Sequence, residues 1–351
     1  MHATHPTAPA ATRTIIAAAV GVILSLASVL AASPALADDV DAISGTPSDG
    51  TGKDSRSSFS YELQAGQQIT DYFLASNTGT TALTATVFST DAFNSADGGF
   101  ALLDTAAEPA DVGGWVTFDG AKKVDIALQP GESKAVTFVL TVPADARPGD
   151  HPGGIVMSVQ KGDGQVLVDR RVGTRLYVRV PGDLQPLLSV SSFTASYDGK
   201  WNPFDGTTNI TATVKNTGNV ALKGEALIGV KGPFGIPIGK VSTDPIDELL
   251  PGGETTISYQ VGGIGQVGLV NPYVTLTPSL TGDASNPGVL KVITRDAVLV
   301  AVPWWLVIVL GLAAIVLVVL RVRAKRDERA AVEWMAYMET EAQRKAIEQE
   351  Q

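Results

Sequence analysis

The side chains best suited to binding chemistry lie in two short segments, Pro148–Gly154 (PGDHPGG) and Gly113–Val116 (GGWV). In the first, Asp150 and His151 offer a carboxylate and an imidazole, next to glycines that relax the backbone. In the second, Trp115 offers an aromatic face on which a sugar ring can stack. Structural roles are the alternative, because an aspartate can cap a turn and a tryptophan can fill a core. These three residues are the candidate ligand-binding site.

The composition excludes several kinds of active site. The chain of 351 residues has no cysteine and three histidines, so disulfides, thiolate metal ligands and a cysteine nucleophile are absent. His2 and His5 fall in a segment that we expect to be removed, which leaves His151 too isolated for a multi-histidine metal site. No Gly-x-Ser-x-Gly motif precedes it, so a serine hydrolase triad is not indicated. We therefore expect no enzyme activity, no cofactor and no metal.

The charge balance argues against nucleic acid as a partner. The chain has 26 Lys and Arg against 36 Asp and Glu, a formal net charge of -10. Binding to a phosphate backbone needs clustered basic residues, which this balance does not favour.

Residues 1–37 have the pattern of a secretory signal peptide. Arg13 precedes the uncharged apolar run Ile15–Ala32, and the small-x-small sequence Ala35-Leu36-Ala37 follows. The run is close to the length of a membrane span, so an uncleaved N-terminal anchor is the alternative.

A second apolar segment, residues 297–320, predicts a transmembrane helix. It contains no charged residue, and Pro303, Trp304 and Trp305 near its start suit the membrane interface. Basic residues follow it closely: Arg321, Arg323, Lys325, Arg326 and Arg329. By the positive-inside rule, the sequence predicts a single-pass protein of a bacterial cell surface, with its N-terminal region extracellular and its C-terminus cytoplasmic.

The cytoplasmic tail, residues 321–351, carries apolar side chains at helical spacing. Ala331, Met335, Met338 and Ala342 recur on one face, with Trp334 and Tyr337 adjoining them. An amphipathic juxtamembrane helix and a frayed segment are both compatible with this pattern.

Between the apolar segments the pattern is that of an all-β protein. Short β-rich runs are separated by Gly, Pro, Asn and Asp, and Ser133–Val142 alternates strictly between two faces. The order of turns and strands also repeats: Asn77-Thr78-Gly79 and a later Pro130-Gly131 turn are matched by Asn216-Thr217-Gly218 and Pro251-Gly252. This repeat predicts two immunoglobulin-like β-sandwich domains followed by a single transmembrane α-helix.

The Pro/Gly-rich stretch Pro181–Pro186 marks the boundary between the domains. We therefore assign residues 58–181 to the first immunoglobulin-like domain and residues 187–295 to the second. Residues 38–57 are rich in Gly, Ser, Thr and Asp, which predicts a flexible leader.

The first domain resembles the peptidoglycan-binding domain of WxL-interacting proteins, which are exported proteins of Gram-positive bacteria. The similarity is carried by Tyr61–Gln67, Ala75–Gly79, Leu128–Ser133, Val142-Pro143 and Pro148–Val156, in that order. The resemblance implies a signal peptide, two immunoglobulin-like domains, one C-terminal span and a short basic-led tail. It also implies that residues 58–180 bind peptidoglycan.

The leading hypothesis is a membrane-anchored, non-enzymatic protein whose first β-sandwich binds the cell wall, its partner being peptidoglycan or another wall polymer. The alternative is a structural or assembly protein whose β-sandwiches bind another exported surface protein. A wall hydrolase is a third hypothesis, for which the sequence supplies no motif.

Overall fold

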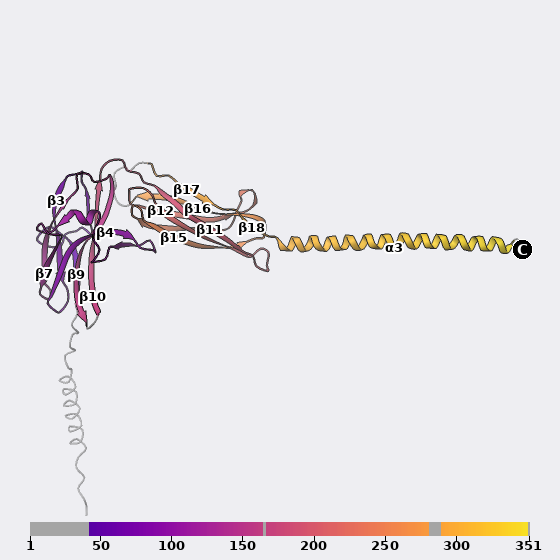
Figure 1. The fold of residues 1–351 in the computed structure, drawn as a ribbon, viewed down its shortest axis with the longest axis horizontal. Coiled ribbons are helices and arrows are strands. Elements are labelled where there is room, and N and C mark those ends of the chain that lie inside the picture. The colour runs from indigo at the N-terminus through magenta and orange to yellow at the C-terminus, as the bar shows by residue number, and fades with distance from the viewer. Residues whose placement is uncertain (1–41, 164–165, 281–288, 350–351) are drawn as a thin grey trace, which may run out of the picture.

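A computed structural model of the chain describes residues 42–163, 166–280 and 289–349. It contains a first domain (residues 42–180), a second domain (residues 188–301) and one long helix, α3 (Trp304–Gln349). Figure 1 shows the second domain between the first domain and α3, so the first domain is remote from the helix. The predicted fold class, two immunoglobulin-like sandwiches and one apolar helix, is confirmed. The predicted signal peptide, residues 1–37, lies outside the described residues.

The first domain packs two sheets face to face. One has the strand order β1-β3-β8-β6, and the other has the order β2-β10-β9-β4-β5 with β7 paired to β4. All pairs are antiparallel except β2 with β10. The strands are β1 (Ile43–Ser48), β2 (Phe59–Glu62), β3 (Gln68–Asn77), β4 (Leu83–Asn94), β5 (Phe100–Leu102), β6 (Val116–Thr117), β7 (Lys123–Leu128), β8 (Ser133–Thr141), β9 (Gly149–Asp163) and β10 (Val166–Val180). A single helical turn, α2 (Val112–Trp115), precedes β6.

The second domain repeats the sandwich plan. Its sheets have the orders β11-β12-β15 and β14-β13-β16-β17, with β18 paired to β16. The strands are β11 (Leu188–Asp198), β12 (Gly206–Asn216), β13 (Leu222–Lys231), β14 (Pro237–Leu249), β15 (Glu254–Ile264), β16 (Gly268–Leu280), β17 (Ile293–Asp296) and β18 (Leu299–Ala301). A short 3-10 turn, η1 (Pro233–Gly235), lies between β13 and β14.

The cores follow from the period of two along each strand. In β8 and the residue after it, Val136, Phe138, Leu140 and Val142 face inward and are each 9% exposed or less, while the residues between them face outward. Each sandwich has its own apolar cluster, so each domain has the separate core expected of an independent folding unit.

The prediction of a flexible leader at residues 38–57 is wrong for its described part. β1 pairs with β3 along its whole length, from Ile43 opposite Asn77 to Ser48 opposite Tyr72. Polar composition concealed this strand, because it adds backbone hydrogen bonds to a sheet edge and buries few large side chains. Residues 38–41 lie outside the described part of the chain.

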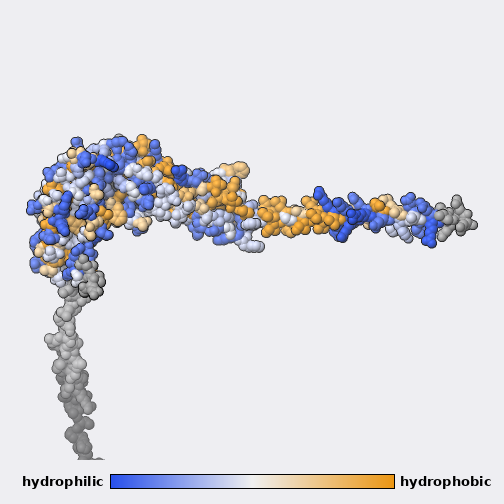
Figure 2. All heavy atoms as spheres, in the orientation of Figure 1, coloured by the Kyte–Doolittle hydropathy of each residue, from blue (hydrophilic) through white to orange (hydrophobic). Residues whose placement is uncertain are grey.

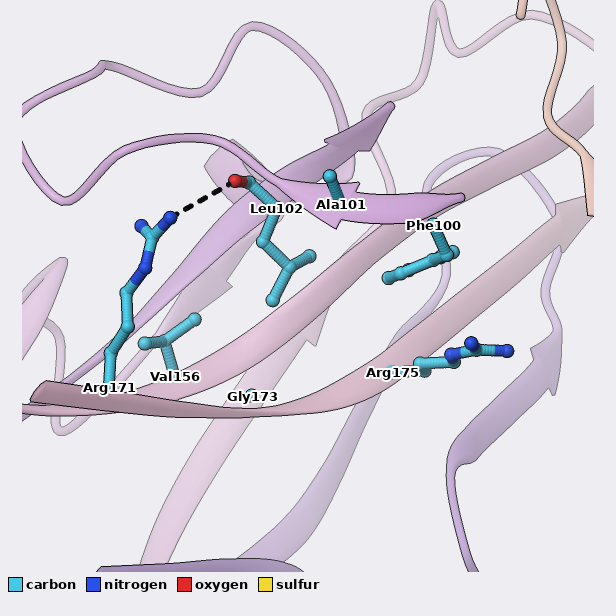
Figure 3. Close-up of a pocket in the computed structure, with 7 residues that line it drawn as sticks. All are labelled: Phe100, Ala101, Leu102, Val156, Arg171, Gly173 and Arg175. Carbon is cyan, nitrogen blue, oxygen red and sulfur yellow. Dashed lines mark hydrogen bonds between the residues drawn. The ribbon is translucent and has the colours of Figure 1, made fainter. Parts of the chain in front are cut away.

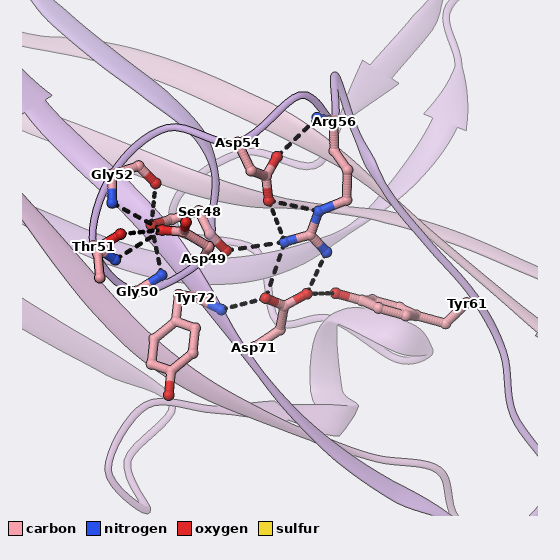
Figure 4. Close-up of polar contacts among 10 residues, drawn as sticks. All are labelled: Ser48, Asp49, Gly50, Thr51, Gly52, Asp54, Arg56, Tyr61, Asp71 and Tyr72. Carbon is pink, nitrogen blue, oxygen red and sulfur yellow. Dashed lines mark hydrogen bonds and ion pairs between the residues drawn. The ribbon is translucent and has the colours of Figure 1, made fainter.

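A polar network holds the segment after β1, as Figure 4 shows. The Arg56 guanidinium donates to Asp54, to Asp71 and to the Ser48 carbonyl, and the Tyr61 hydroxyl also donates to Asp71. Burial favours the neutral form of Asp71, but the hydrogen bonds from Arg56 and Tyr61 outweigh it and lower the pKa of Asp71. These contacts make the segment part of the first domain.

The long helix begins later than residue 297, where the sequence pattern predicts its start. Within the apolar segment, Leu299–Ala301 form β18, which pairs with β16, and α3 begins only at Trp304. This helix is long and apolar enough to cross a membrane, and within the described chain it is the one helix with that property. It continues without a break through the tail and ends at Gln349. Within the tail, the rings of Trp334 and Tyr337 stack with centroids 6.0 Å apart.

Candidate functional site

The turn that carries Trp115 is fixed by one carboxylate. Asp91, in β4, accepts hydrogen bonds from the backbone N–H groups of Ala110, Asp111 and Gly113 at 2.6, 2.8 and 2.7 Å. The N–H groups of Asp111 and Gly113 belong to the start of α2, where a helix leaves its donors unpaired, so the Asp91 side chain satisfies them. Trp115 is thereby held half-buried against the core of the first domain.

His151 packs against Trp115, with ring centroids 4.6 Å apart. Nδ1 of His151 lies 2.7 Å from a carboxylate oxygen of Asp111, and Nε2 lies 2.9 Å from the carbonyl oxygen of Arg147. Because both partners accept, both ring nitrogens donate. Burial opposes the charged ring, but the hydrogen bond to Asp111 outweighs it, and the pKa of His151 is raised. Both nitrogens are occupied, which favours a structural role for this histidine.

Asp150 faces the opposite way, as adjacent residues of a strand do. Its carboxylate accepts two hydrogen bonds from Arg179, at 2.6 and 2.8 Å, and one from the backbone N–H of Ala221 in the second domain, at 2.7 Å. Its own N–H donates to the carbonyl of Asn219 at 2.8 Å. The structure therefore brings Trp115 and His151 together and directs Asp150 to the junction between the domains.

The glycines of the PGDHPGG segment are explained by close packing. A Cβ on Gly153 would lie 2.6 Å from the Thr90 carbonyl oxygen, and one on Gly154 would lie 2.7 Å from Leu102 in β5. Without side chains there, α2 and β5 can lie directly on β9. This distinctive motif thus positions neighbouring elements.

A cavity that the sequence did not reveal lies under β5, as Figure 3 shows. It has a volume of about 430 Å³ and is lined by Phe100, Ala101, Leu102, Val156, Arg171, Gly173 and Arg175. Arg171, Gly173 and Arg175 recur at even spacing along β10, so they share one face of that strand. The signal that could have found it is the run Arg171-x-x-x-Arg175-x-x-x-Arg179, with a glycine in the first gap.

The two arginines in the cavity differ in how firmly they are held. Nη1 of Arg171 donates to the Leu103 carbonyl at 2.7 Å. The Arg175 guanidinium lies over the Phe100 ring, 4.5 Å from its centroid, and its contacts to Tyr177 and Glu248 are long, at 3.5 Å each. Its side chain is 51% exposed. Arg175 therefore presents a cation, stacked on an aromatic ring, that can take up a stronger anionic partner.

The domain junction beside this cavity is polar and specific. Nδ2 of Asn94 donates to the Glu248 carbonyl, and the N–H of Leu250 donates back to Oδ1 of Asn94, both at 2.8 Å. The Tyr177 hydroxyl donates to Glu248 at 2.8 Å, and burial together with this hydrogen bond raises the pKa of Tyr177. The other oxygen of Glu248 is buried without a hydrogen-bond partner. Paired donors and acceptors of this kind fix the orientation of one domain on the other.

The described ranges contain no cluster of three or more His, Cys, Asp or Glu side chains placed to hold a metal ion.

Comparison with known proteins adds little beyond the fold. No protein-family profile and no curated protein matches the chain. Among solved structures, a chaperone–tip adhesin complex of CFA/I fimbriae shares 10% identity over 72% of this chain and 98% of its own, with a TM-score of 0.33. The class 5 fimbriae chaperone CfaA shares 12% identity over 67% and 95%, with a TM-score of 0.33. The Salmonella enterica SafA pilin with the SafB chaperone shares 12% over 75% and 99%, with a TM-score of 0.28. At this level of similarity the matches assign no function to the chain.

Proposed function

We propose that this chain is a non-enzymatic, single-pass protein of a bacterial cell surface. Its helix α3 anchors it in the membrane, its two sandwiches lie outside, and its first domain binds a carboxylate-bearing wall polymer, namely peptidoglycan. The apolar helix and the basic residues after it support the anchoring and the orientation. The hydrogen bonds at the domain junction support a fixed orientation of the first domain on the second, at a distance from the helix.

The observation that carries the binding proposal is the cavity under β5. It places the Arg175 guanidinium over the aromatic ring of Phe100, and a second guanidinium, that of Arg171, lines the same cavity at the Leu102 end. Peptidoglycan offers the complementary groups, because its peptides carry carboxylates and its sugars have apolar faces. A guanidinium binds a carboxylate through two parallel hydrogen bonds, and an aromatic ring packs on an apolar sugar face. The cavity, rather than the Trp115–His151 pair, is therefore the binding site that we propose.

Co-sedimentation of the full chain, in detergent micelles, with purified sacculi tests this function. Arg175→Ala and Arg171→Ala should each lower the bound fraction, with an affinity loss of about tenfold for Arg175, the value expected for one charged hydrogen-bonded contact. Arg295→Ala is the matched control, because it removes one exposed arginine from the second domain. Wild-type recovery no better than that of an unrelated acidic protein would contradict the proposal.

A second function, binding of another exported protein by strand addition, is favoured by the edge of β15. Within the described residues, β15 pairs with β12 on one side and with no strand on the other. An unpaired edge can take up an additional strand through main-chain hydrogen bonds. Crosslinking in intact cells distinguishes the two functions, because adducts that contain protein without glycan support strand addition.

A further inference from the structure

Three loops of the second domain gather at the point where the chain enters α3. They are residues 199–205, 232–236 and 265–267, which we call the membrane-proximal loops. The antiparallel pairing places their ends together: Lys231 lies opposite Asn271, and Gly206 lies opposite Ile264. β18 ends at Ala301, opposite Gly268, and only two residues separate it from the first residue of α3.

One buried side chain ties two of these loops to the helix. Oε1 of Gln266 accepts from the backbone N–H of Trp304 at 3.2 Å, and Nε2 of Gln266 donates to the Lys200 carbonyl at 2.9 Å. The N–H of Gln266 also donates to the Pro203 carbonyl at 2.7 Å. Gln266 is 7% exposed. The start of the helix and the loops are therefore one hydrogen-bonded unit.

These loops present large apolar side chains to solvent. Trp201 is 98% exposed, Phe204 72% and Phe234 101%, while Ile236 and Val267 add aliphatic surface. Phe234 also has a backbone φ of 62°, a conformation that bulky residues rarely adopt. Figure 2 shows apolar surface where the second domain meets α3, continuous with the helix. Such a concentration of exposed aromatic side chains marks an interaction surface.

A lipid surface is the occupant that this geometry selects. The loops adjoin the residues at which an apolar helix of membrane-spanning length begins, so the surface continues a contact with lipid. The headgroup layer beyond the ~30 Å hydrocarbon core is several ångströms deep and favours tryptophan and other aromatic side chains. Trp201 and Phe204 thus extend the aromatic belt begun by Trp304 and Trp305.

We propose that the membrane-proximal loops insert Trp201, Phe204 and Phe234 into the headgroup region of the leaflet that α3 enters. The second domain is then docked on the bilayer through its loops as well as through the helix. This inference rests on the membrane span assigned under the proposed function.

Quenching of tryptophan fluorescence by brominated lipids tests this contact in the full chain reconstituted into phosphatidylcholine vesicles. The chain has five tryptophans, so variants with four Trp→Phe changes leave Trp201, Trp304 or Trp115 as the single emitter. With bromine placed on the acyl chain close to the headgroup, Trp201 should lose most of its emission and shift to shorter wavelength. Trp304 should be quenched as well, and Trp115, in the domain remote from the helix, should not.

The three emitters separate the outcomes. Quenching of Trp304 without quenching of Trp201 overturns the loop contact and leaves the span intact. An absence of quenching at both positions overturns the span and the loop contact together. A blue shift of Trp201 without quenching assigns the loops to a protein surface and also overturns the proposal. Adding Phe204→Ser and Phe234→Ser to the Trp201 variant should reduce its quenching, and both residues are exposed, so the fold should be unaffected.

Discussion

The two domains are built around the same hydrogen-bonding scheme, centred on Asn77 in the first and Asn216 in the second. Both asparagines are almost fully buried, and the amide oxygen of each accepts from the glycine two residues later at 3.0 Å. The backbone N–H and carbonyl of each also bond to the later Pro-Gly turn. The amide nitrogens donate to the carbonyls of Thr81 and Leu128 in the first domain, and to those of Val220 and Leu249 in the second.

Outside this scheme the domains differ. The first domain adds α2, β5 and the cavity between β5 and β10, whereas the second domain exposes aromatic loops next to α3. The shared part is buried and satisfies backbone polar groups, whereas the cavity of the first domain and the aromatic loops of the second are open to solvent. The comparison teaches that the repeated motif defines a scaffold, and that the contacts proposed above with wall polymer and lipid use elements that are not repeated.

The largest loss of stability should come from removing the hydrogen bonds of Asp150 at the domain junction. Asp150→Ala removes the partner of Arg179, whose side chain is 15% exposed, and the acceptor for Ala221 N–H. An unpaired buried charge costs about 3–5 kcal/mol. Urea unfolding of the full chain in micelles measures this loss. Asp183→Ala, at an exposed linker carboxylate, is the control, and an equal effect of the two changes would show that the junction contributes no stability.

The next largest effect should come from the shared asparagines. Asn77→Ala and Asn216→Ala each remove a side-chain donor from two carbonyl groups, at an expected cost of about 2–4 kcal/mol per domain. Asn216→Ala should be the more costly, because both of its carbonyl partners are buried. Thermal unfolding checks both values against Asn202→Ala, an exposed asparagine. A small loss of stability in one domain alone would show that the two asparagines do not contribute equally to their domains.

A pH-dependent effect should be confined to the first domain. Because the pKa of His151 is raised on folding, its pairing with Asp111 stabilises fully below the ordinary histidine pKa of about 6.5, and this contribution is lost as pH rises through the folded-state value. His151→Gln should therefore destabilise by about 1.5 kcal/mol at acidic pH and by less at alkaline pH. Melting temperatures of both proteins across this pH range measure the difference. An equal loss at every pH would mean that His151 acts by packing alone.

The smallest effect should be equal in the two domains. Gly131 and Gly252 occupy matching Pro-Gly turns with φ of 75° and 79°, and open space surrounds both positions. Replacement by alanine should cost about 1 kcal/mol at each, since only the backbone conformation is penalised. Chemical unfolding of the two single variants provides the measurement. Unequal losses in the free energy of unfolding would show that the two turns, although matched in sequence, contribute differently to stability.

Much of the fold could be predicted because its signals are local. The alternation in Ser133–Val142 identified β8 and its buried face, and the Pro-Gly pairs identified turns whose glycines do have positive φ. The strand β1 was missed, because its contribution is backbone pairing with β3 and its side chains are small or polar. The start of α3 was placed too early, since an apolar pattern does not distinguish an edge strand from the beginning of a helix.

The site was harder to predict because it depends on contacts between distant segments. His151 and Trp115 are paired as candidates in the sequence and do touch in the structure. Asp150 was grouped with them, yet its partners are Arg179 and the backbone of the second domain, which no local pattern indicates. The cavity under β5 depends on a hairpin folding over β10. Composition alone does not reveal such an arrangement.

The unbroken run of α3 has a mechanical consequence. Its 46 residues extend about 69 Å, more than twice the ~30 Å thickness of the hydrocarbon core. Only two residues join it to β18, and the side chain of Gln266 accepts a hydrogen bond from the N–H of its first residue, Trp304. Because the helix is stiff and is fixed to the second domain at Trp304, it acts as a lever. Any tilt of the two domains against the bilayer therefore displaces the far end of the helix, at Gln349, in proportion to the tilt.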